Sequence, residues 1–405
     1  MAGDKVELIL SRIRTLPTLP TVIYKLLKLI ESPTSTATEL SEVISKDQAL
    51  TARVLKLVNS SFYALRCEVV KVSHGIALLG FVAIKNLALG LAVIDMFGRG
   101  HDEGELDSDA FWEHSLCCAT CARLIAERAR YVPAEEAFVA GLLHDLGKLV
   151  MHEHFRRDLD SAIRAAREDM IPLPQAERFF FKIDHAAIGA ALAEHWRLPS
   201  TLRAAIGGHH LFSKDDKLTN IVYLANLLSR VKGIGSSGNT LLEPLDERAW
   251  AAVGIEESSV IRLLGKLAPE VRNARIFLGL SIPPKGGPLD DEPVPLETPT
   301  QRVLIIEEEA SPISLVELIM LDHGHTTART TNPFDEAAQM ADLIVLDFSA
   351  PSLSRARALR RQIEASLEDG VPVVLLPAPR RVSDVADAAN AALRGAPVDG
   401  AAPRR

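Results

Sequence analysis

The first two thirds of the chain place apolar residues at three- and four-residue spacing, the pattern of helices that bury one face. Leu50, Val54 and Leu57 form such a stripe. Thr36 and Glu39 fit a capping box, which is a paired start signal of a helix. Alternating apolar and polar residues, which would indicate strands, are rare in the first hundred residues. We therefore predict a bundle of short helices separated by polar turns.

One predicted helix, over residues 133–151, carries an unusual pair of polar residues. Phe138 and Leu142 mark its buried face, and Asp145 falls on the same face with His144 beside it. A carboxylate in that position is costly unless it meets a cation or several hydrogen-bond donors. The adjacent imidazole and carboxylate suit a metal ion. The alternative is that the two side chains satisfy each other or a backbone group.

Further histidines lie on or beside other predicted helices of the same region. His114 shares a helix with three cysteines, which we assign to packing because residues so close along one helix cannot all face one ion. We predict that these histidines and the His-Asp pair converge on one pocket, with Asn226 of a later apolar helix nearby. The predicted set comprises His114, His144, Asp145, His185, His209 and His210.

The pattern changes after a proline-rich, acidic stretch at residues 281–301, which we predict to be a linker. Short apolar runs typical of buried parallel strands follow at 302–306, 341–348 and 371–376. Helices are predicted between them, over 312–321 and 352–367. Strands that alternate with helices predict a doubly wound α/β domain.

Composition and charge exclude several classes of protein. Hydrophobic residues make up 47% and charged residues 24%, as in ordinary globular proteins. The net charge of −8 makes nucleic-acid or anionic-membrane binding an unfavourable interpretation. The apolar run 75–94 has Lys85 and Asn86 at its centre, so two core helices are predicted there and no membrane segment. Four cysteines without a signal-peptide pattern predict a cytoplasmic protein.

Longer motifs make the helical region recognisable. It resembles the HDOD domain, the HD-related output domain of bacterial signalling proteins, over about residues 16–228. The resemblance rests on "LPTLPTV", "ELSEVISKDQALTARVLKLVNSSFY", "VSHGIALLGFVAIKNLALG", "GLLHDLGKL", "DHAAIGAALAEHWRLP" and "HH" with "IVYLAN". The segment from His144 to Lys148 has the "HDxGK" form of the wider HD superfamily of metal-dependent phosphohydrolases. Gln48 departs from the family, which usually has proline there.

The resemblance implies an all-α signalling module that is generally regarded as non-enzymatic and acts through protein contacts. His114, His144, Asp145, His185 and His209 match the HD metal-ligand pattern, and His210 is the alternative to His209. Asn226 stands where a catalytic HD enzyme has its last ligand, an aspartate. A neutral amide is a much weaker donor to a divalent ion. We therefore expect a divalent metal of unknown identity, and little or no hydrolysis.

The enzyme alternative follows from the same resemblance. In it, a metal-bound hydroxide would attack the phosphorus of a nucleotide or a cyclic dinucleotide, and Lys148 would stabilise the phosphoryl oxygens.

The C-terminal region resembles the receiver domain of two-component signalling, with Asp347 at the phosphoacceptor position. Glu307 and Glu308 stand where the acidic pair that holds magnesium would be. Pro377 replaces the expected hydroxyl residue, no matching lysine follows, and the region ends one strand-helix unit short. The resemblance therefore implies a degenerate receiver, and an α/β interaction domain without phosphate chemistry is the favoured interpretation.

The sequence thus predicts a cytoplasmic bacterial signalling regulator in four segments. These are an all-α HDOD domain at 5–280, the linker at 281–301, a receiver-like α/β domain at 302–395 and a tail at 396–405. The expected partners are other signalling proteins, and a homodimer is left open.

Overall fold

The computed structural model describes most of the chain. The described residues are 9, 11, 21–31, 34–60, 63, 65, 67–97, 104–239, 241–243, 245–278, 300–308, 314–332, 336–349, 353–366, 371–378 and 380–393. The predicted tail and all but the last two residues of the predicted linker lie outside this set, as does the segment Leu16–Pro20 of the first HDOD-like motif.

The described chain up to residue 278 is helical, as predicted, apart from the two-residue strand β1 (Leu241–Leu242). Its helices are α2 (Thr21–Glu31), α3 (Ala37–Ser45), α4 (Gln48–Val58), α5 (Val72–Leu79), α6 (Phe81–Phe97), α7 (Ser108–Arg128), α8 (Ala134–Leu143), α9 (Leu146–Glu168), α10 (Leu173–Phe181), α11 (His185–His195), α12 (Ser200–Gly208), α13 (Lys217–Lys232), α14 (Glu247–Val253) and α15 (Glu257–Leu278). The predicted capping box forms at the start of α3, where Thr36 and Glu39 exchange hydrogen bonds.

The helix predicted over 133–151 is in fact two helices, α8 and α9, which meet at His144 and Asp145. Asp145 departs from helical geometry, with φ −94° and ψ 13°. Just after the break, α9 packs so closely on α11 that residue 147 must be glycine, because a Cβ there would lie only 1.9 Å from the carbonyl oxygen of His185. Periodicity did not show this break, since both halves keep helical spacing.

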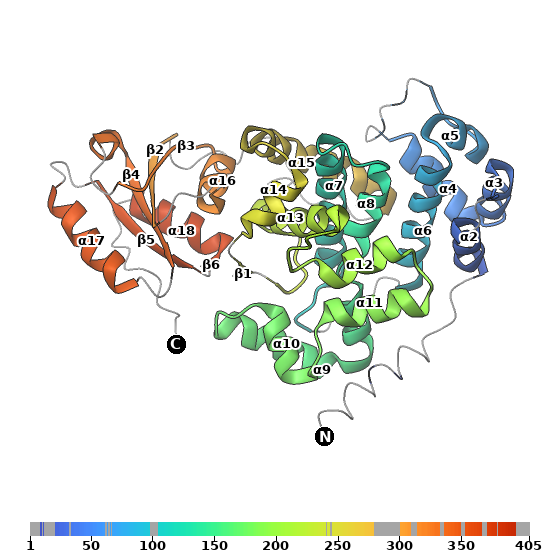
Figure 1. The fold of residues 1–405 in the computed structure, drawn as a ribbon, viewed down its shortest axis with the longest axis horizontal. Coiled ribbons are helices and arrows are strands. Elements are labelled where there is room, and N and C mark those ends of the chain that lie inside the picture. Colours follow the sequence, from blue (N-terminus) through green and yellow to red (C-terminus); the bar gives the residue numbers. More distant parts are fainter. Residues whose placement is uncertain are drawn as a thin grey trace.

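Helices α7 and α8 form the centre of the helical region, with α6 on one side and α13 on the other (Figure 1). The apolar run at 75–94 is split between α5 and α6 at Gly80, which has a φ of 94°. This confirms the two predicted core helices. In the part of the chain that the structure describes, no helix has the length and hydropathy needed to cross a membrane.

The C-terminal region is an α/β unit built on a four-stranded parallel sheet with strand order β3-β2-β4-β5. Its elements are β2 (Arg302–Glu307), α16 (Leu315–Asp322), β3 (Thr326–Thr330), the short helix η1 (Glu336–Met340), β4 (Leu343–Ser349), α17 (Leu353–Ser366), β5 (Val373–Ala378), β6 (Arg380–Arg381) and α18 (Val382–Leu393). The three predicted strands are confirmed, whereas β3 and α18 were not predicted.

The sheet is covered on both faces, and alternate strand residues enter different cores. Val303 and Ile305 of β2 pack in the cluster that contains α16 and α18 residues. Leu304 and Ile306 pack in a second cluster with α17 residues such as Ile363. Alternation of this kind is what buries a parallel strand on both sides.

The first of these clusters is continuous with the core of the helical region. Helix α16 packs against α13 and α15 (Figure 1), and Lys232 of α13 pairs with Asp322 at the end of α16. Strand β1 pairs antiparallel with β6, so the helical and α/β regions also share a small ladder.

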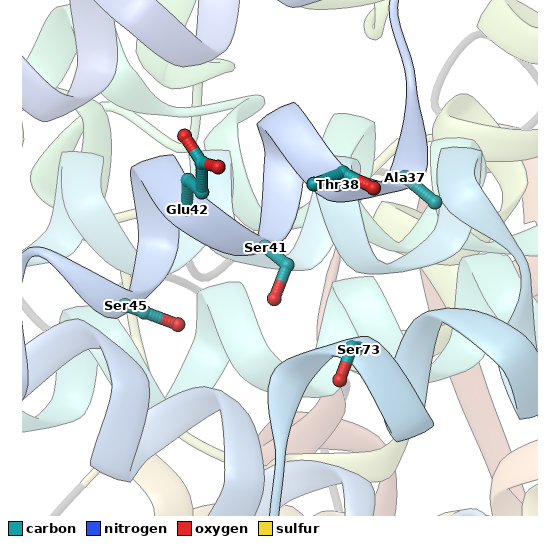
Figure 2. A pocket seen from close by; sticks show the side chains of 6 residues that line it. All are labelled: Ala37, Thr38, Ser41, Glu42, Ser45 and Ser73. Atoms are coloured by element: carbon teal, nitrogen blue, oxygen red, sulfur yellow. The ribbon is translucent and has the colours of Figure 1, made fainter.

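A shallow hollow of about 260 Å³ lies between α3 and the start of α5 (Figure 2). Its lining residues are Ala37, Thr38, Ser41, Glu42, Ser45 and Ser73. Among the described residues of this lining, Glu42 is the only ionisable side chain, and none of the predicted ligands is among them.

Candidate metal centre

The structure brings together the histidines and the aspartate that the sequence singled out. His114 comes from the first half of α7, and His144 and Asp145 come from the α8–α9 junction. His185 is the first residue of α11, and His209 and His210 follow directly after α12. All of these side chains are buried or nearly so, although the helices that carry them are far apart in sequence.

The carboxylate of Asp145 lies at the centre of the cluster and divides it into two halves. Its Oδ2 lies 3.2 Å from Nε2 of His144 and 3.9 Å from Nε2 of His114. Its Oδ1 lies 3.1 Å from Nε2 of His185 and 3.4 Å from Nε2 of His209. Potential ligand atoms of each half lie within 4.8 Å of one another, and Asp145 is common to both halves.

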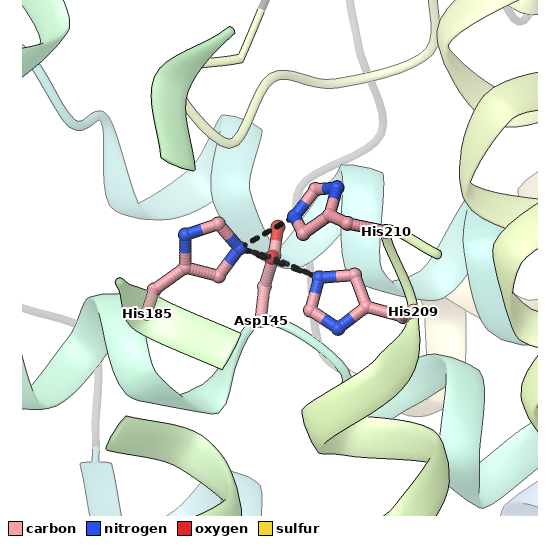
Figure 3. A group of neighbouring side chains, drawn as sticks. All are labelled: Asp145, His185, His209 and His210. Atoms are coloured by element: carbon pink, nitrogen blue, oxygen red, sulfur yellow. Dashed lines mark hydrogen bonds and ion pairs between the residues drawn. The ribbon is translucent and has the colours of Figure 1, made fainter. Parts of the chain in front are cut away.

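His210 completes the second half. Figure 3 shows the rings of His185, His209 and His210 gathered around the Asp145 carboxylate. Nε2 of His185 lies 2.9 Å from Nε2 of His210 and 3.3 Å from Nε2 of His209. The sequence offered His210 as an alternative to His209, and the structure places both beside Asp145 and His185.

Backbone and side-chain acceptors fix the orientation of three imidazoles. Nδ1 of His144 donates to the carbonyl of Gly141 at 2.7 Å, and Nδ1 of His209 donates to the carbonyl of Ile206 at 2.7 Å. Nδ1 of His185 donates to the carboxylate of Glu177 at 2.6 Å. An imidazole whose outer nitrogen donates in this way turns the lone pair of its other nitrogen toward a metal.

Several of the atoms that face the centre lack hydrogen-bond partners among the described residues. These are Nε2 of His114, Nε2 of His144 and Oδ1 of Asp145. Buried polar atoms are rarely left in this state, because desolvation without a hydrogen bond is costly. Imidazole nitrogens and a carboxylate oxygen are ligands of zinc and of other divalent transition metals. The donor set therefore fits a divalent metal ion.

The protonation states of His114, His209 and Asp145 suit metal binding, whereas His185 must release a proton before it binds a metal. Burial lowers the pKa of His114 well below its ordinary value, and burial lowers the pKa of His209 to about 4. Both rings are therefore neutral at pH 7 and retain a lone pair. Burial also opposes protonation of His185, but the Glu177 carboxylate raises the pKa of His185 to about 8. Burial favours the neutral acid of Asp145, yet His144 and Lys148 hold its pKa well below the ordinary value, so the carboxylate is ionised.

Comparison with known proteins identifies the domain that contains this cluster. Residues 16–212 match the sequence profile of the HDOD domain family. The protein carries an HDOD domain. The match takes in every clustered residue from His114 to His210.

Three relatives define the extent of the similarity. An HDOD domain protein of unknown function from Geobacter sulfurreducens is 26% identical, with a TM-score of 0.53, over 65% of this chain and 99% of its own. A candidate phosphohydrolase from Shewanella amazonensis SB2B is 26% identical, with a TM-score of 0.50, over 67% of this chain and 95% of its own. An uncharacterized protein of Treponema pallidum is 26% identical over 202 residues, which are 50% of this chain and 39% of that protein. The present chain thus matches about two fifths of the Treponema protein's length.

Lys148 of the HDOD domain lies inside the cluster. Its Nζ donates to Oδ2 of Asp145 at 2.8 Å and to Oγ of Ser237 at 3.0 Å, and the residue is only 1% exposed. The ammonium group thereby neutralises Asp145 in the described structure.

Two further acidic residues of the site were missed by sequence reasoning. Glu177 on α10 is fully buried and contacts His185, and Glu243 lies 4.0 Å from Nδ1 of His210. Glu177 does fall among apolar residues of an amphipathic helix, and that position is its only sequence signal. Nothing in the sequence around Glu243 points to a site.

The other residues that the sequence singled out in the helical region are buried. Asn226 is buried on α13, which packs against α7 and α8. Cys117, Cys118 and Cys121 are fully buried free thiols. All three belong to the apolar core of the helical region, where they pack as small apolar side chains.

The acidic residues predicted for the α/β region lie at the carboxyl ends of β2 and β4. Glu307 pairs in register with Asp347, and Glu308 follows Glu307 directly. A guanidinium group occupies this neighbourhood, because Nη1 of Arg329 lies 3.7 Å from Oε1 of Glu307. Arg329 also pairs through Nε with Glu317 at 2.9 Å. Pro377 lies in β5 opposite Phe348 of β4.

Proposed function

We propose that this protein is a signalling regulator whose HDOD domain holds divalent metal as a structural centre and acts through protein contacts. The main support for a structural role is that the metal-binding side chains are buried. The side chains of His144, His185 and His209 are 0% exposed, and that of Asp145 is 1% exposed. A phosphate ester must reach the metal to be hydrolysed, and these four side chains present almost no surface to solvent.

Two features of the polar residues support a non-catalytic role. Lys148, the residue that would stabilise phosphoryl oxygens, is already engaged by Asp145 and Ser237. Asn226 supplies a neutral amide where the HD resemblance implies an aspartate ligand, which weakens the hold on a metal and on its bound water.

The second candidate function is metal-dependent hydrolysis of a nucleotide or a cyclic dinucleotide. Retention of the His and Asp donors favours it, as does the Shewanella relative that is described as a candidate phosphohydrolase. A bound divalent ion would supply a hydroxide nucleophile in such a reaction. In this chain, His114, His144, Asp145, His185, His209 and His210 are the residues that would hold the metal.

Metal analysis of the purified full-length protein tests the proposal. We expect bound divalent metal in the parent and in His195→Ala, which removes an exposed histidine of α11, and none in the double variant His144→Ala, Asp145→Ala. Absence of metal from the parent protein, even after incubation with divalent metal, would overturn the metal centre.

Activity assays separate the two functions. We expect no turnover of cyclic dinucleotides or nucleoside phosphates by the metal-loaded parent. Turnover that disappears in His144→Ala would instead establish the hydrolase. Turnover that appears only in Asn226→Asp would identify a lapsed enzyme.

We further propose that the α/β region is a degenerate receiver. Its strand order and the pairing of Glu307 with Asp347 support this interpretation, and Arg329 supplies a fixed positive charge where a magnesium ion would otherwise be needed.

The proposed segments are the HDOD domain at 5–280, the linker at 281–301, the receiver-like domain at 302–395 and the tail at 396–405. The proposed setting is the cytoplasm, with other signalling proteins as partners, and sedimentation analysis would test a homodimer.

A further inference from the structure

His210 differs from the other imidazoles of the cluster in how its outer nitrogen is held. His144 and His209 donate to backbone carbonyls, and His185 donates to Glu177. Nδ1 of His210 makes no hydrogen bond within the described residues, and the Glu243 carboxylate lies 4.0 Å from it. The side chain of His210 is also 12% exposed. Its ring is therefore placed by His185, 2.9 Å from its Nε2, and by the nearby Glu243 carboxylate, and not by a backbone carbonyl.

Glu243 is in turn held by Arg230 of α13 together with β1. Glu243 directly follows β1 in the chain. Nη1 of Arg230 donates to the carbonyl of Leu241 at 2.6 Å, and Nη2 of Arg230 lies 3.8 Å from the Glu243 carboxylate. The guanidinium group thus contacts both β1 and Glu243, and it holds them against α13, which packs against α7 and α8 of the metal centre.

The strand that pairs with β1 belongs to the α/β region. Leu241 pairs with Arg381 and Leu242 pairs with Arg380, the two residues of β6. Both leucines of β1 are only 3% exposed. In Figure 1, β1 and β6 lie side by side at the junction of the two regions. A continuous set of contacts therefore leads from the α/β region to His210.

We propose that the α/β region sets the metal affinity of one half of the centre by holding β1, and with it Glu243, against His210. The proposal rests on the proposed metal centre. Glu243 is a positioning residue, which acts on the metal only through His210. Displacement of β6 releases β1 and weakens the half formed by Asp145, His185, His209 and His210. The half formed by His114, His144 and Asp145 keeps its affinity, because its imidazoles do not contact Glu243.

Two variants of the full-length protein interrupt these contacts at different points. Glu243→Gln removes the carboxylate charge, and exposed Glu247→Gln, four residues further on, is its matched control. Arg381→Pro removes a backbone N–H from β6, while proline is tolerated at the start of a helix such as α18. Asp322→Asn is the control for Arg381→Pro, because it breaks the Lys232–Asp322 contact between the same regions without touching β1.

Titration of the metal-free proteins with Co²⁺, followed by visible absorption and calorimetry, measures each half. The parent is expected to bind two ions in separate steps. Glu243→Gln and Arg381→Pro should weaken one step about tenfold and leave the other unchanged, which is the size of effect typical of residues behind a metal ligand. Both controls should match the parent. Unchanged steps in the two variants, or equal weakening of both steps, would overturn the coupling.

Histidine ring spectra of the metal-free proteins keep the two proposals distinguishable. A parent that binds no Co²⁺ overturns the metal centre, and the coupling is then decided by ¹⁵N ring resonances assigned with His210→Gln. Shifts of the His210 signals in Glu243→Gln and Arg381→Pro, without shifts of the His114 signals, support the coupling. Unmoved His210 signals overturn it.

Discussion

The carboxylate of Glu177 accepts two hydrogen bonds from His185, one from the backbone N–H at 2.9 Å and one from ring Nδ1 at 2.6 Å. The residue is fully buried, although its other oxygen, Oε1, has no hydrogen-bond partner among the described residues. One carboxylate thereby fixes both the start of α11 and the direction in which the His185 ring presents Nε2.

Replacement of this carboxylate is expected to weaken metal binding. Glu177→Gln keeps the size of the side chain but removes the charge that orients and polarises His185, so affinity for Co²⁺ should fall about tenfold. Calorimetric titration measures the change. Glu194→Gln, an exposed residue of α11, provides the control and should bind like the parent. Equal affinities for Glu177→Gln and the parent would show that the contact is purely structural.

Gly147 is expected to be essential to the fold of the site. A Cβ at this position would lie 1.9 Å from the carbonyl oxygen of His185, and backbone cannot move aside cheaply. Gly147→Ala should lower the free energy of unfolding by about 3 kcal/mol. Urea denaturation measures this loss. Gly265→Ala on α15, where a Cβ would meet no atom within 4 Å, should instead raise stability by about 0.5 kcal/mol.

The buried thiols are expected to be unreactive in the native protein. Burial raises the pKa of Cys117 to about 12 and raises the pKa values of Cys118 and Cys121 well above the ordinary value, whereas Cys67 is exposed. The reactive species is the thiolate, and a raised pKa keeps a thiol protonated below that pKa. At pH 8, a disulfide reagent should therefore titrate one thiol per native chain and four per unfolded chain. A second native equivalent would contradict the buried positions.

The α/β region is expected to resist phosphorylation. Arg329 pairs with Glu307, the side chain that lies in register with Asp347, and Pro377 offers no hydroxyl to an incoming phosphoryl group. Treatment with acetyl phosphate and magnesium should leave the mass of the protein unchanged. A gain of one phosphate that is abolished by Asp347→Asn would make this a working receiver.

The sequence predicted those parts of the fold in which local pattern and burial agree. The apolar runs that became β2, β4 and β5 were found because each is buried on both faces. Strand β3 was missed because its sequence, "TTART", is polar, and its residues are exposed or half-buried at the edge of the sheet. A polar edge strand looks like a loop to any argument from hydrophobic spacing.

The residues of the candidate site also fall into those that the sequence predicted and those that it did not. His144 and Asp145 were found because two chemically matched residues stand side by side on an apolar segment. The break between α8 and α9 was not found, because both halves keep helical spacing, and the close contact between Gly147 and His185 of α11 is tertiary. Glu177 and Glu243 could not be assigned either, since what makes each of them part of the site is tertiary packing against a histidine.

The continuity between the core of the helical region and one face of the sheet determines how this protein can be dissected. Val303 and Ile305 of the sheet, with Leu318 of α16, belong to the same apolar cluster as α13 and α15 residues. Cutting the chain in the segment before β2 would expose, on each fragment, the apolar surface that the other fragment covers in the intact protein. Such fragments would tend to aggregate, so a truncation that loses activity would report on solubility before it reported on signalling. Point substitutions at the junction are therefore the better way to separate the contributions of the two regions to signalling.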